Sequence, residues 1–511
     1  MSRPTVDQPV AQLLDAFAGA TPDDLDAEYE RLVGALWEEG ALTDRAAAAT
    51  PDLVAALDRV GAGRQGHVLV LLGLLAQAEY PATDGPVATA VRAGLDGYLD
   101  LLGRAPTREP LALALLYLLS HLSEDRDRIL AAVADLGLEP EERTRLERTV
   151  TPLDPADAVL GRVWPSPYEW SLNESEREYD RRWISSLSPE QLASAWQADT
   201  TMVRAYMGAK AWWAVRHGTP TVVADASAHR EAVEAGAEEI ARDVFSRHAD
   251  AFRCPTCRGR LEFTVDGARC VGCSTAFPLA HGVLDLSAGV ADVPDEEDVL
   301  QNAAAMKSIG PYYERVLRPA FLRVMGSNWG GEVTPVDEDR YLAEHTAPTD
   351  GPVLDLAAGA GRWTAVVAGA VGAGRLVAID MLTPMMICLR ERLPEVAAVR
   401  AGALALPFGD ATLGAVNCWN ALQALPDAAA AIAEVGRCLR PGGTFTVLTF
   451  RFGSDPIYRH FQSSHSFPGH PHGIPLFEFD EIRKWLDDAG MVVREESGPG
   501  TFVFVTAERT A

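Results

Sequence analysis

Hydrophobic and polar positions follow a helical pattern over the first part of the chain. From residue 7 to about residue 150, broadly apolar segments alternate with short breaks of glycine, proline or charged residues. Thr21-Pro22-Asp23-Asp24 is a helix start signal, because it combines a hydroxyl cap, a first-turn proline and acids near the positive helix end. The pattern predicts a helical domain over residues 1–150, and stacked helical pairs of the HEAT type are one interpretation.

The helical pattern continues over residues 151–250, but tryptophan becomes dense there. Six of the eleven tryptophans fall in this part of the chain: Trp164, Trp170, Trp183, Trp196, Trp212 and Trp213. Two interpretations stay open, an aromatic-rich core between helical layers and a groove that stacks on a substrate or partner. The first half of the chain is therefore predicted to be all-α.

Four cysteines mark a different kind of segment at residues 251–290. They form two CxxC pairs on either side of a twelve-residue stretch with strand alternation: Cys254, Cys257, Cys270 and Cys273. Four thiolates supply the tetrahedral sulfur ligands that Zn²⁺ accepts, and a closed set of four indicates a structural site. Two disulfides are the alternative, which a reducing compartment disfavours. The segment resembles the small zinc ribbon that precedes or partners many methyltransferases.

A strand, a small-residue turn and a helix follow one another in GPVLDLAAGAGRW. Val353 to Leu356 reads as a buried parallel strand, and the turn from Asp355 to Gly361 lets a ligand approach the backbone closely. The N–H groups at the start of the following helix favour an anion. A second strand ends in Asp380, twenty-five residues beyond Asp355, where an acid can accept hydrogen bonds from ribose hydroxyls. These features alone allow S-adenosylmethionine, a nicotinamide or a flavin.

The order of the remaining motifs resembles the ubiquinone/menaquinone-biosynthesis-like methyltransferase family over some 150 residues. The motifs are DLAAGAG, VAIDMLTPMM, VRAGALALPFGDATLGAV, NALQALPD and LRPGG. The resemblance implies a class I S-adenosylmethionine-dependent methyltransferase at residues 300–511, with a Rossmann-like α/β fold and a mostly parallel seven-stranded sheet. It also implies these cofactor-binding residues: Asp355, Ala357, Gly359, Ala360, Gly361, Asp380, Met381, Gly402, Ala403 and Trp419.

Two glycines depart from the family pattern. Gly402 stands where many relatives carry Asp or Asn to accept the adenine amino group, and Gly414 replaces the usual Asp of the fourth strand. A lost adenine contact costs on the order of 1 kcal/mol, which weakens cofactor binding without abolishing it.

Histidines crowd into the region after the fifth predicted strand, which covers the substrate in this fold. Four of the eleven lie there: His460, His465, His470 and His472. A histidine with a near-neutral pKa can act as a general base, and we take His465 as the first candidate and His460 as the second. A metal site and a polar surface loop are the alternatives. Tyr312 and Tyr313 resemble lid tyrosines of the family, and core packing is the alternative for them.

Charge and length narrow the choice of partner. A chain of 511 residues is multidomain, and its net charge of -27 disfavours phosphate backbones and anionic lipid surfaces. A secretory signal and a membrane-spanning run are not apparent, so we expect a cytoplasmic protein. The predicted partners are a small-molecule or peptide substrate and, through the helical half, a second copy of the chain.

Three functions therefore compete. The first is an S-adenosylmethionine-dependent methyltransferase of a small molecule or peptide, and the helical half then recognises the substrate or mediates self-association. The second is a ribosomal RNA base methyltransferase, which also combines a zinc ribbon with this fold but calls for a basic surface. The third is a scaffold or S-adenosylmethionine-binding protein that transfers no methyl group.

Overall fold

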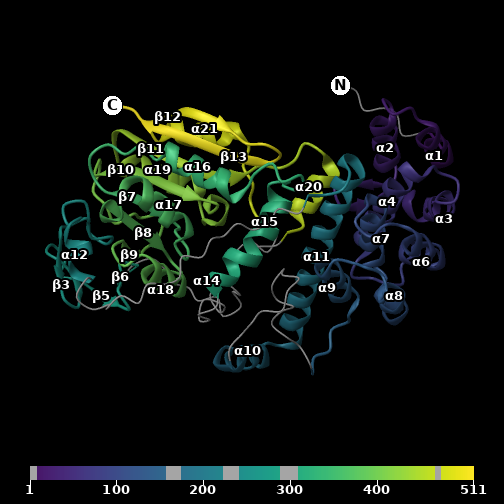
Figure 1. The fold of residues 1–511 in the computed structure, drawn as a ribbon, viewed down its shortest axis with the longest axis horizontal. Helices are drawn as coiled ribbons and strands as arrows, with labels where there is room; N and C mark the ends of the chain where they lie inside the picture. Colours follow the sequence, from purple (N-terminus) through teal and green to yellow (C-terminus); the bar gives the residue numbers. More distant parts are fainter. Residues whose placement is uncertain (1–7, 157–173, 222–240, 288–308, 466–472) are drawn as a thin grey trace. The chain divides into compact units, whose positions relative to one another are not determined.

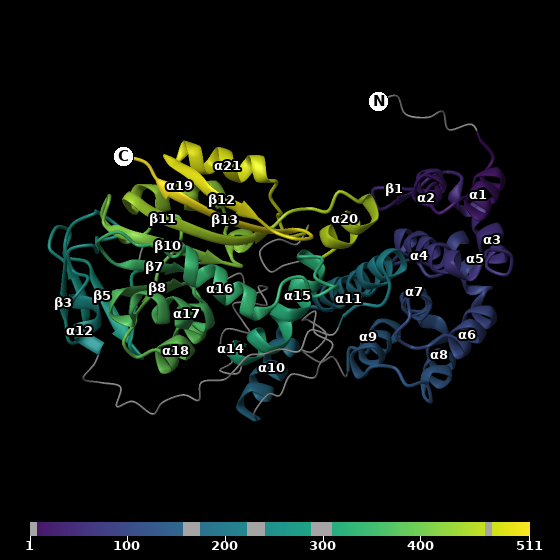
Figure 2. The ribbon, with the colours of Figure 1, turned by 45° about the horizontal axis from the view of Figure 1, so that its top comes forward.

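The structure is a computed structural model that forms two compact units (Figures 1 and 2). It describes residues 8–156, 174–221, 241–287, 309–465 and 473–511. The helical unit comprises residues 1–170, 178–221 and 453–466, and the sheet unit comprises residues 171–177, 222–452 and 467–511. The division of the chain into four domains stays a prediction.

Helices make up most of the described part of the helical unit. Their bounds are α1 (Val10–Gly19), α2 (Leu25–Gly34), α3 (Ala46–Ala56), α4 (Ala62–Glu79), α5 (Pro86–Arg92), α6 (Leu95–Arg104), α7 (Pro110–Leu119), η1 (Ser123–Asp125), α8 (Arg126–Val133), α9 (Pro140–Val150), α10 (Glu174–Ser186, of which residues 178–186 belong to this unit), α11 (Pro189–His217) and α20 (Pro456–Ser463). A short hairpin of β1 (Trp37–Glu38) and β2 (Ala41–Leu42) departs from the all-α prediction. Trp164 and Trp170 lie outside the described residues.

The core of the helical unit forms where α4, α7 and α11 pack together. α4 and α7 are apolar on nearly all sides, as expected of helices surrounded by others, and most of their residues are buried. α11 starts with a capping box, in which Ser188 and Gln191 each accept a hydrogen bond from the other's backbone N–H. Of the tryptophans on α11, Trp212 is buried against Tyr29, which favours a packing role for that residue.

Helix α20 belongs to the helical unit although it comes from the C-terminal part of the chain. Asp455 caps it by accepting the N–H groups of Ile457 and Tyr458 at 2.9 Å. The same carboxylate accepts the indole N–H of Trp212 at 3.0 Å and pairs with Arg216 at 2.6 Å, both on α11. These contacts explain why α20, which follows strand β11 (Leu439–Phe450) along the chain, packs among N-terminal helices.

The sheet unit is built on a mixed sheet of eleven strands, in the order β12-β13-β11-β10-β7-β8-β9-β6-β5-β4-β3. The strand bounds are β3 (Leu261–Thr264), β4 (Gly267–Cys270), β5 (Ala276–Ala280), β6 (Val283–Asp285), β7 (Val353–Leu356), β8 (Leu376–Asp380), β9 (Ala397–Arg400), β10 (Leu413–Trp419), β11 (Leu439–Phe450), β12 (Met491–Ser497) and β13 (Phe502–Arg509).

The prediction of a mostly parallel, seven-stranded sheet is correct only for the centre of this sheet. Strands β11, β10, β7, β8, β9 and β6 pair in parallel, whereas antiparallel strands extend the sheet at both ends. The extra strands come from the cysteine-rich segment, because β6 pairs with β9 and brings β5, β4 and β3 into the same sheet. The sequence pattern had placed that segment in a separate small domain.

Helices cover both faces of the parallel centre. Figure 2 shows α16, α17 and α18 below the sheet and α19 and α21 above it. The helix bounds are α12 (Ala241–Ser246), α14 (Ile309–Tyr312), η3 (Tyr313–Leu317), α15 (Arg318–Met325), α16 (Pro335–His345), α17 (Arg362–Val371), η4 (Ala373–Arg375), α18 (Thr383–Arg392), η5 (Leu422–Ala424), α19 (Ala428–Cys438) and α21 (Phe479–Asp488). Central strands covered on both faces are expected to be mostly apolar, and β7 and β10 are buried at every position, with Asp355 and Asn417 as their polar residues.

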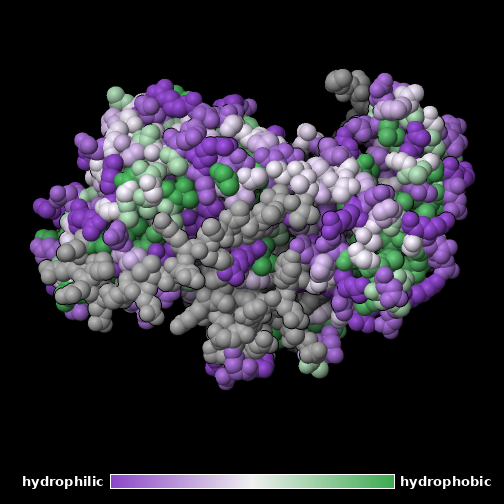
Figure 3. All heavy atoms as spheres, in the orientation of Figure 1, coloured by the Kyte–Doolittle hydropathy of each residue, from purple (hydrophilic) through white to green (hydrophobic). Residues whose placement is uncertain are grey.

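Hydrophilic and hydrophobic residues are interspersed over the coloured part of the face seen in Figure 3. Among the described helices, none combines the length and apolarity that crossing a membrane requires.

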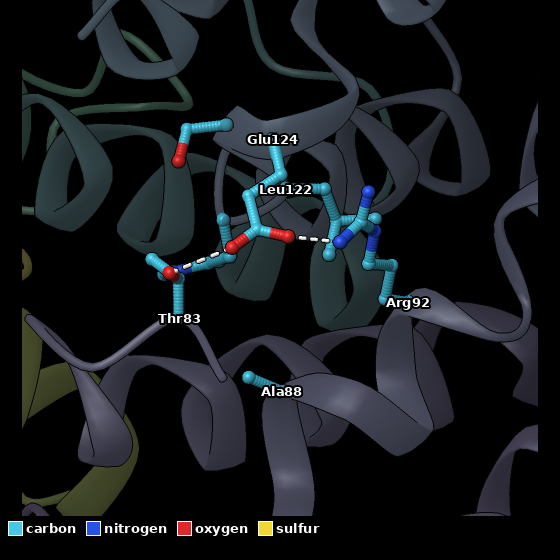
Figure 4. A pocket seen from close by; sticks show the side chains of 7 residues that line it. Thr83, Ala88, Arg92, Leu122 and Glu124 are labelled. Atoms are coloured by element: carbon cyan, nitrogen blue, oxygen red, sulfur yellow. Dashed lines mark hydrogen bonds and ion pairs between the residues drawn. The ribbon is translucent and has the colours of Figure 1, made fainter. Parts of the chain in front are cut away.

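The helical unit has a small hollow lined by Thr83, Arg92 and Glu124 (Figure 4). Arg92 pairs there with Glu124 and with Asp125, so the charged groups at the hollow already contact one another.

Candidate functional site

The turn between β7 and α17 has the backbone geometry of a ligand-binding loop. Ala357, Gly359 and Gly361 all adopt positive φ, at 57°, 54° and 86°. A Cβ at Gly361 would lie 2.8 Å from Leu389, so this position requires glycine. A Cβ at Gly359 would meet nothing within 4 Å, so the space beside the turn is open. The turn therefore presents the N-terminus of α17 to an anion.

Asp380 ends β8 directly beside this turn. Its carboxylate accepts the backbone N–H of Gly359 and that of Leu382, each at 2.9 Å. Burial raises the pKa of Asp380, and these hydrogen bonds oppose the rise. The two bonds fix the carboxylate at the carboxyl edge of the sheet, the position where an acid binds ribose in this kind of fold.

Asp355 lies in β7 and is buried. Its carboxylate accepts a hydrogen bond from the hydroxyl of Thr364 on α17. Burial raises the pKa of Asp355 to about 7, and the nearby Asp380 adds to the rise. A positively charged ligand would stabilise both ionised carboxylates, so the site fits the ammonium and sulfonium groups of S-adenosylmethionine.

The other predicted cofactor residues border the same edge of the sheet. Ala360 is buried in the turn, and Met381 follows Asp380. Gly402 and Ala403 lie in the loop after β9. Trp419 ends β10, but its indole N–H donates to Glu338 on α16 at 2.9 Å, so this side chain is engaged in packing.

Gly414 has a packing explanation that the sequence did not reveal. A Cβ at this position would lie 2.5 Å from the carbonyl oxygen of Thr349 and 3.2 Å from that of Asp350. Its N–H and C=O also bond to the segment before β7, through Pro352 and Thr349. The departure from the family's Asp therefore reflects close backbone packing at the amino end of β10, away from the carboxyl edge.

The helix turn that carries Tyr313 lies against the cofactor turn. Glu314 pairs with Arg392 at 2.7 Å, and Arg392 also donates to the carbonyl of Ala360 at 3.1 Å. The hydroxyl of Tyr313 accepts the side-chain amide of Asn420 at 3.2 Å, just after β10. Burial raises the pKa of Tyr313, which keeps the phenol protonated. The sequence pattern did not identify Asn420 or the Glu314–Arg392 pair, whose partners lie far apart along the chain.

The two candidate catalytic histidines lie in the helical unit. The His460 ring packs edge-on against Trp37 and lies 3.3 Å from the side-chain amide of Gln77. His465 follows α20 and is buried. Burial lowers the pKa of each to about 4, so both imidazoles are neutral at pH 7. Their catalytic role stays a prediction, and His470 and His472 lie outside the described residues.

The four predicted metal ligands converge in the cysteine-rich segment. The ligand atoms of Cys254, Cys257, Cys270 and Cys273 all lie within 4.8 Å of one another. The Sγ atoms of Cys254 and Cys273 are 3.7 Å apart, and those of Cys257 and Cys270 are 3.4 Å apart. Tetrahedral ligands at about 2.3 Å from a zinc ion would be about 3.8 Å apart. The cluster therefore fits a four-thiolate metal site.

Comparison with known proteins finds that the sheet unit is similar to methyltransferases. Residues 353–443 match the family model described as a methyltransferase domain. An uncharacterized chloroplastic methyltransferase of Arabidopsis thaliana is 28% identical over 48% of this chain and 70% of its own length. The demethylmenaquinone methyltransferase of Roseiflexus castenholzii is 35% identical over 22% of this chain and 48% of its own length.

Solved structures give a weaker likeness. A SAM dependent methyltransferase from Aquifex aeolicus is 19% identical, with a TM-score of 0.28, over 37% of this chain and 92% of that chain.

Among the curated relatives, the chain spans 58% of a Lactococcus lactis demethylmenaquinone methyltransferase, about the same share as for several others. The family match, the glycine turn and the acid after the second strand agree. The C-terminal part of the chain is a class I S-adenosylmethionine-dependent methyltransferase domain.

Proposed function

We propose that this protein transfers the methyl group of S-adenosylmethionine to a small molecule or peptide. The observation that carries the proposal is the pairing of an open, left-handed turn at Gly359 with the fixed carboxylate of Asp380, which accepts the Gly359 N–H. An NAD-type turn would serve a pyrophosphate instead, and the buried carboxyl of Asp355, whose partner among the described residues is the Thr364 hydroxyl, disfavours so negative a ligand.

Each end of the cofactor has a candidate partner. The N–H groups of the turn at Gly359 to Gly361 would hold the methionine carboxylate, and Asp355 its amino group. Asp380 would accept hydrogen bonds from the ribose hydroxyls, and the loop that starts at Gly402 would border adenine. The bound cofactor supplies an electrophilic methyl group. The protein then has to hold the acceptor in line and exclude water.

We propose an acceptor that is already electron-rich. Both candidate bases, His460 and His465, have pKa values of about 4, which makes them weak proton acceptors at neutral pH. An ionised phenol, enolate or thiol requires little help from a base. Several relatives are named as demethylmenaquinone methyltransferases, so an aromatic small molecule of that kind is the first acceptor to test.

We further propose that the cysteine cluster holds one structural zinc ion. None of the seven cysteines, which all lie in the described part of the chain, forms a disulfide, as expected in the reducing cytoplasm that we propose as the location. We assign substrate recognition or self-association to the helical unit, since the residues proposed to bind the cofactor all lie in the sheet unit. The net charge of -27 makes RNA a disfavoured acceptor.

The first experiment is calorimetric titration of the full chain with S-adenosylhomocysteine, followed by incubation with S-adenosylmethionine labelled in the methyl group. We expect micromolar binding and label in a demethylmenaquinone-like acceptor or in a low-molecular-weight fraction of a cell extract. Absence of binding at millimolar ligand would overturn the cofactor assignment. Label found only in RNA would overturn the proposed substrate class.

A further inference from the structure

Three charged residues form one row at the edge of the sheet where the cofactor turn lies. β8 ends at Asp380, β9 at Arg400 and β6 at Asp285. These strands are parallel, and the register places Arg400 opposite Asp380 on one side and opposite Asp285 on the other. The last strand of the cysteine-rich segment therefore ends in the same row as the acid that is assigned to ribose.

Arg400 joins the two outer strands of this row. Its Nε donates to the carbonyl oxygen of Met381 at 3.2 Å, and Met381 is the residue that follows Asp380. Its Nη1 donates to Asp285 at 3.2 Å and to the hydroxyl of Ser287 at 2.9 Å. The planar guanidinium can make these bonds at once, because its donors point in fixed and different directions.

Asp285 and Ser287 are themselves held in one arrangement. Asp285 accepts the backbone N–H of Ser287 at 2.9 Å and its hydroxyl at 2.6 Å, so the Ser287 oxygen is free to accept from Arg400. Ser287 is only 6% exposed. The backbone is tied in the same place, since the N–H of Leu286 donates to the carbonyl oxygen of Arg400 at 2.9 Å.

We propose that Asp285 and Ser287 are positioning residues of the cofactor site, acting through Arg400 on the backbone at Met381. The inference rests on the proposed function, because it assumes that Asp380 binds the cofactor ribose. Arg400 fixes the peptide that follows Asp380, and the carboxylate of Asp380 in turn holds the N–H of Gly359. The cysteine-rich segment is thus part of the cofactor site and more than a separate stabilising module.

The test is a double-mutant cycle of Asp285→Asn and Arg400→Met, read by calorimetric titration with S-adenosylhomocysteine and by thermal unfolding. We expect each single variant to bind 3- to 10-fold more weakly, and the double variant to bind no more weakly than the worse single variant. This non-additivity is the signature of residues that act through one another. A purely structural role would lower the melting temperature and leave the affinity unchanged.

Two control variants separate local from general effects. Glu262→Gln removes an exposed carboxylate of the same segment on β3, and Arg494→Met breaks an arginine–glutamate pair with Glu508 at the other end of the sheet. Both should bind within twofold of the wild type. Wild-type affinity in folded Asp285→Asn and Arg400→Met would overturn the positioning role alone. A wild-type chain that does not bind would instead overturn the proposed function.

Discussion

At the scale of single residues, the cofactor site depends on two carboxylates that the fold holds at the ends of neighbouring strands. Burial raises the pKa of both Asp355 and Asp380. Each shift means that the ionised carboxylate is less stable in the folded protein than in water, which lowers the stability of the ligand-free protein. A cationic ligand at this edge of the sheet reduces that cost. Cofactor binding should therefore be sensitive to either acid.

We predict that Asp380→Ala weakens S-adenosylhomocysteine binding at least tenfold, which corresponds to about 1.4 kcal/mol. The substitution removes a charged acceptor from the ribose and from the N–H groups of Gly359 and Leu382. Calorimetric titration measures the affinity, and circular dichroism checks the fold. Asp350→Ala, at an exposed turn before β7, is the matched control. Unchanged affinity in folded Asp380→Ala would refute the assigned site.

A catalytic role of His465 or His460 predicts a loss of 10²–10⁴ in turnover for the asparagine variant, with nearly unchanged cofactor affinity. Because burial lowers the pKa of both to about 4, the acid limb of the pH–rate profile should lie near pH 4 instead of pH 6–7. Steady-state rates with a labelled acceptor test this. If both variants keep activity within threefold, catalysis depends on positioning of the acceptor.

At the scale of elements, local sequence patterns predicted the strands and turns of the cofactor site and the cysteine pairs. The extent of the sheet and the position of α20 depend on long-range contacts, which these patterns did not predict. The strand, turn and helix around Gly359 and the two CxxC pairs are local, and the structure has both where the sequence predicted them. The extension of the sheet by β6 depends on pairing with β9, more than 100 residues away. The position of α20 depends on the contact of Asp455 with Trp212. Periodicity contains no signal for either pairing.

Metal removal is predicted to lower thermal stability. The full chain should contain about one zinc per molecule, and Cys257→Ser should lose it, because a closed four-thiolate set holds the ion without an open position. Emission spectrometry of dialysed protein gives the metal content, and calorimetric unfolding gives the stability. Cys388→Ser, which alters a thiol outside the cluster, is the control. Less than about half an equivalent of zinc would contradict the site.

At the scale of the whole molecule, the two units contain buried ionisable groups of different kinds. In the helical unit, burial lowers the pKa of His67, His460 and His465 to about 4. In the sheet unit, burial lowers the pKa of His248 to about 4 but raises that of Asp355 to about 7. A lowered histidine pKa costs stability as the pH falls, whereas a raised aspartate pKa costs stability as the pH rises. The two effects therefore oppose each other in the sheet unit.

We predict that acidification from pH 7 to pH 5 destabilises the helical unit more than the sheet unit. Its unfolded chain takes up protons below pH 6.5, while the folded histidines stay neutral until about pH 4. Each such histidine contributes at most about 2 kcal/mol of lost stability at pH 5. Calorimetric unfolding measures the shift, and the transition that S-adenosylhomocysteine moves identifies the sheet unit.

His67→Phe provides the decisive comparison for this prediction. The ring of His67 packs among Phe17, Tyr29 and Trp212, and Tyr29 bonds only to its backbone carbonyl, so a phenyl ring fits the same surroundings. The lowered pKa comes first from burial and then from Arg216 and Arg64, with Asp26 opposing. Removing the His67 imidazole should reduce the fall in the unfolding temperature of the helical unit between pH 7 and pH 5. An equal shift in the variant, or a larger shift in the sheet unit, would show that other groups govern the acid response.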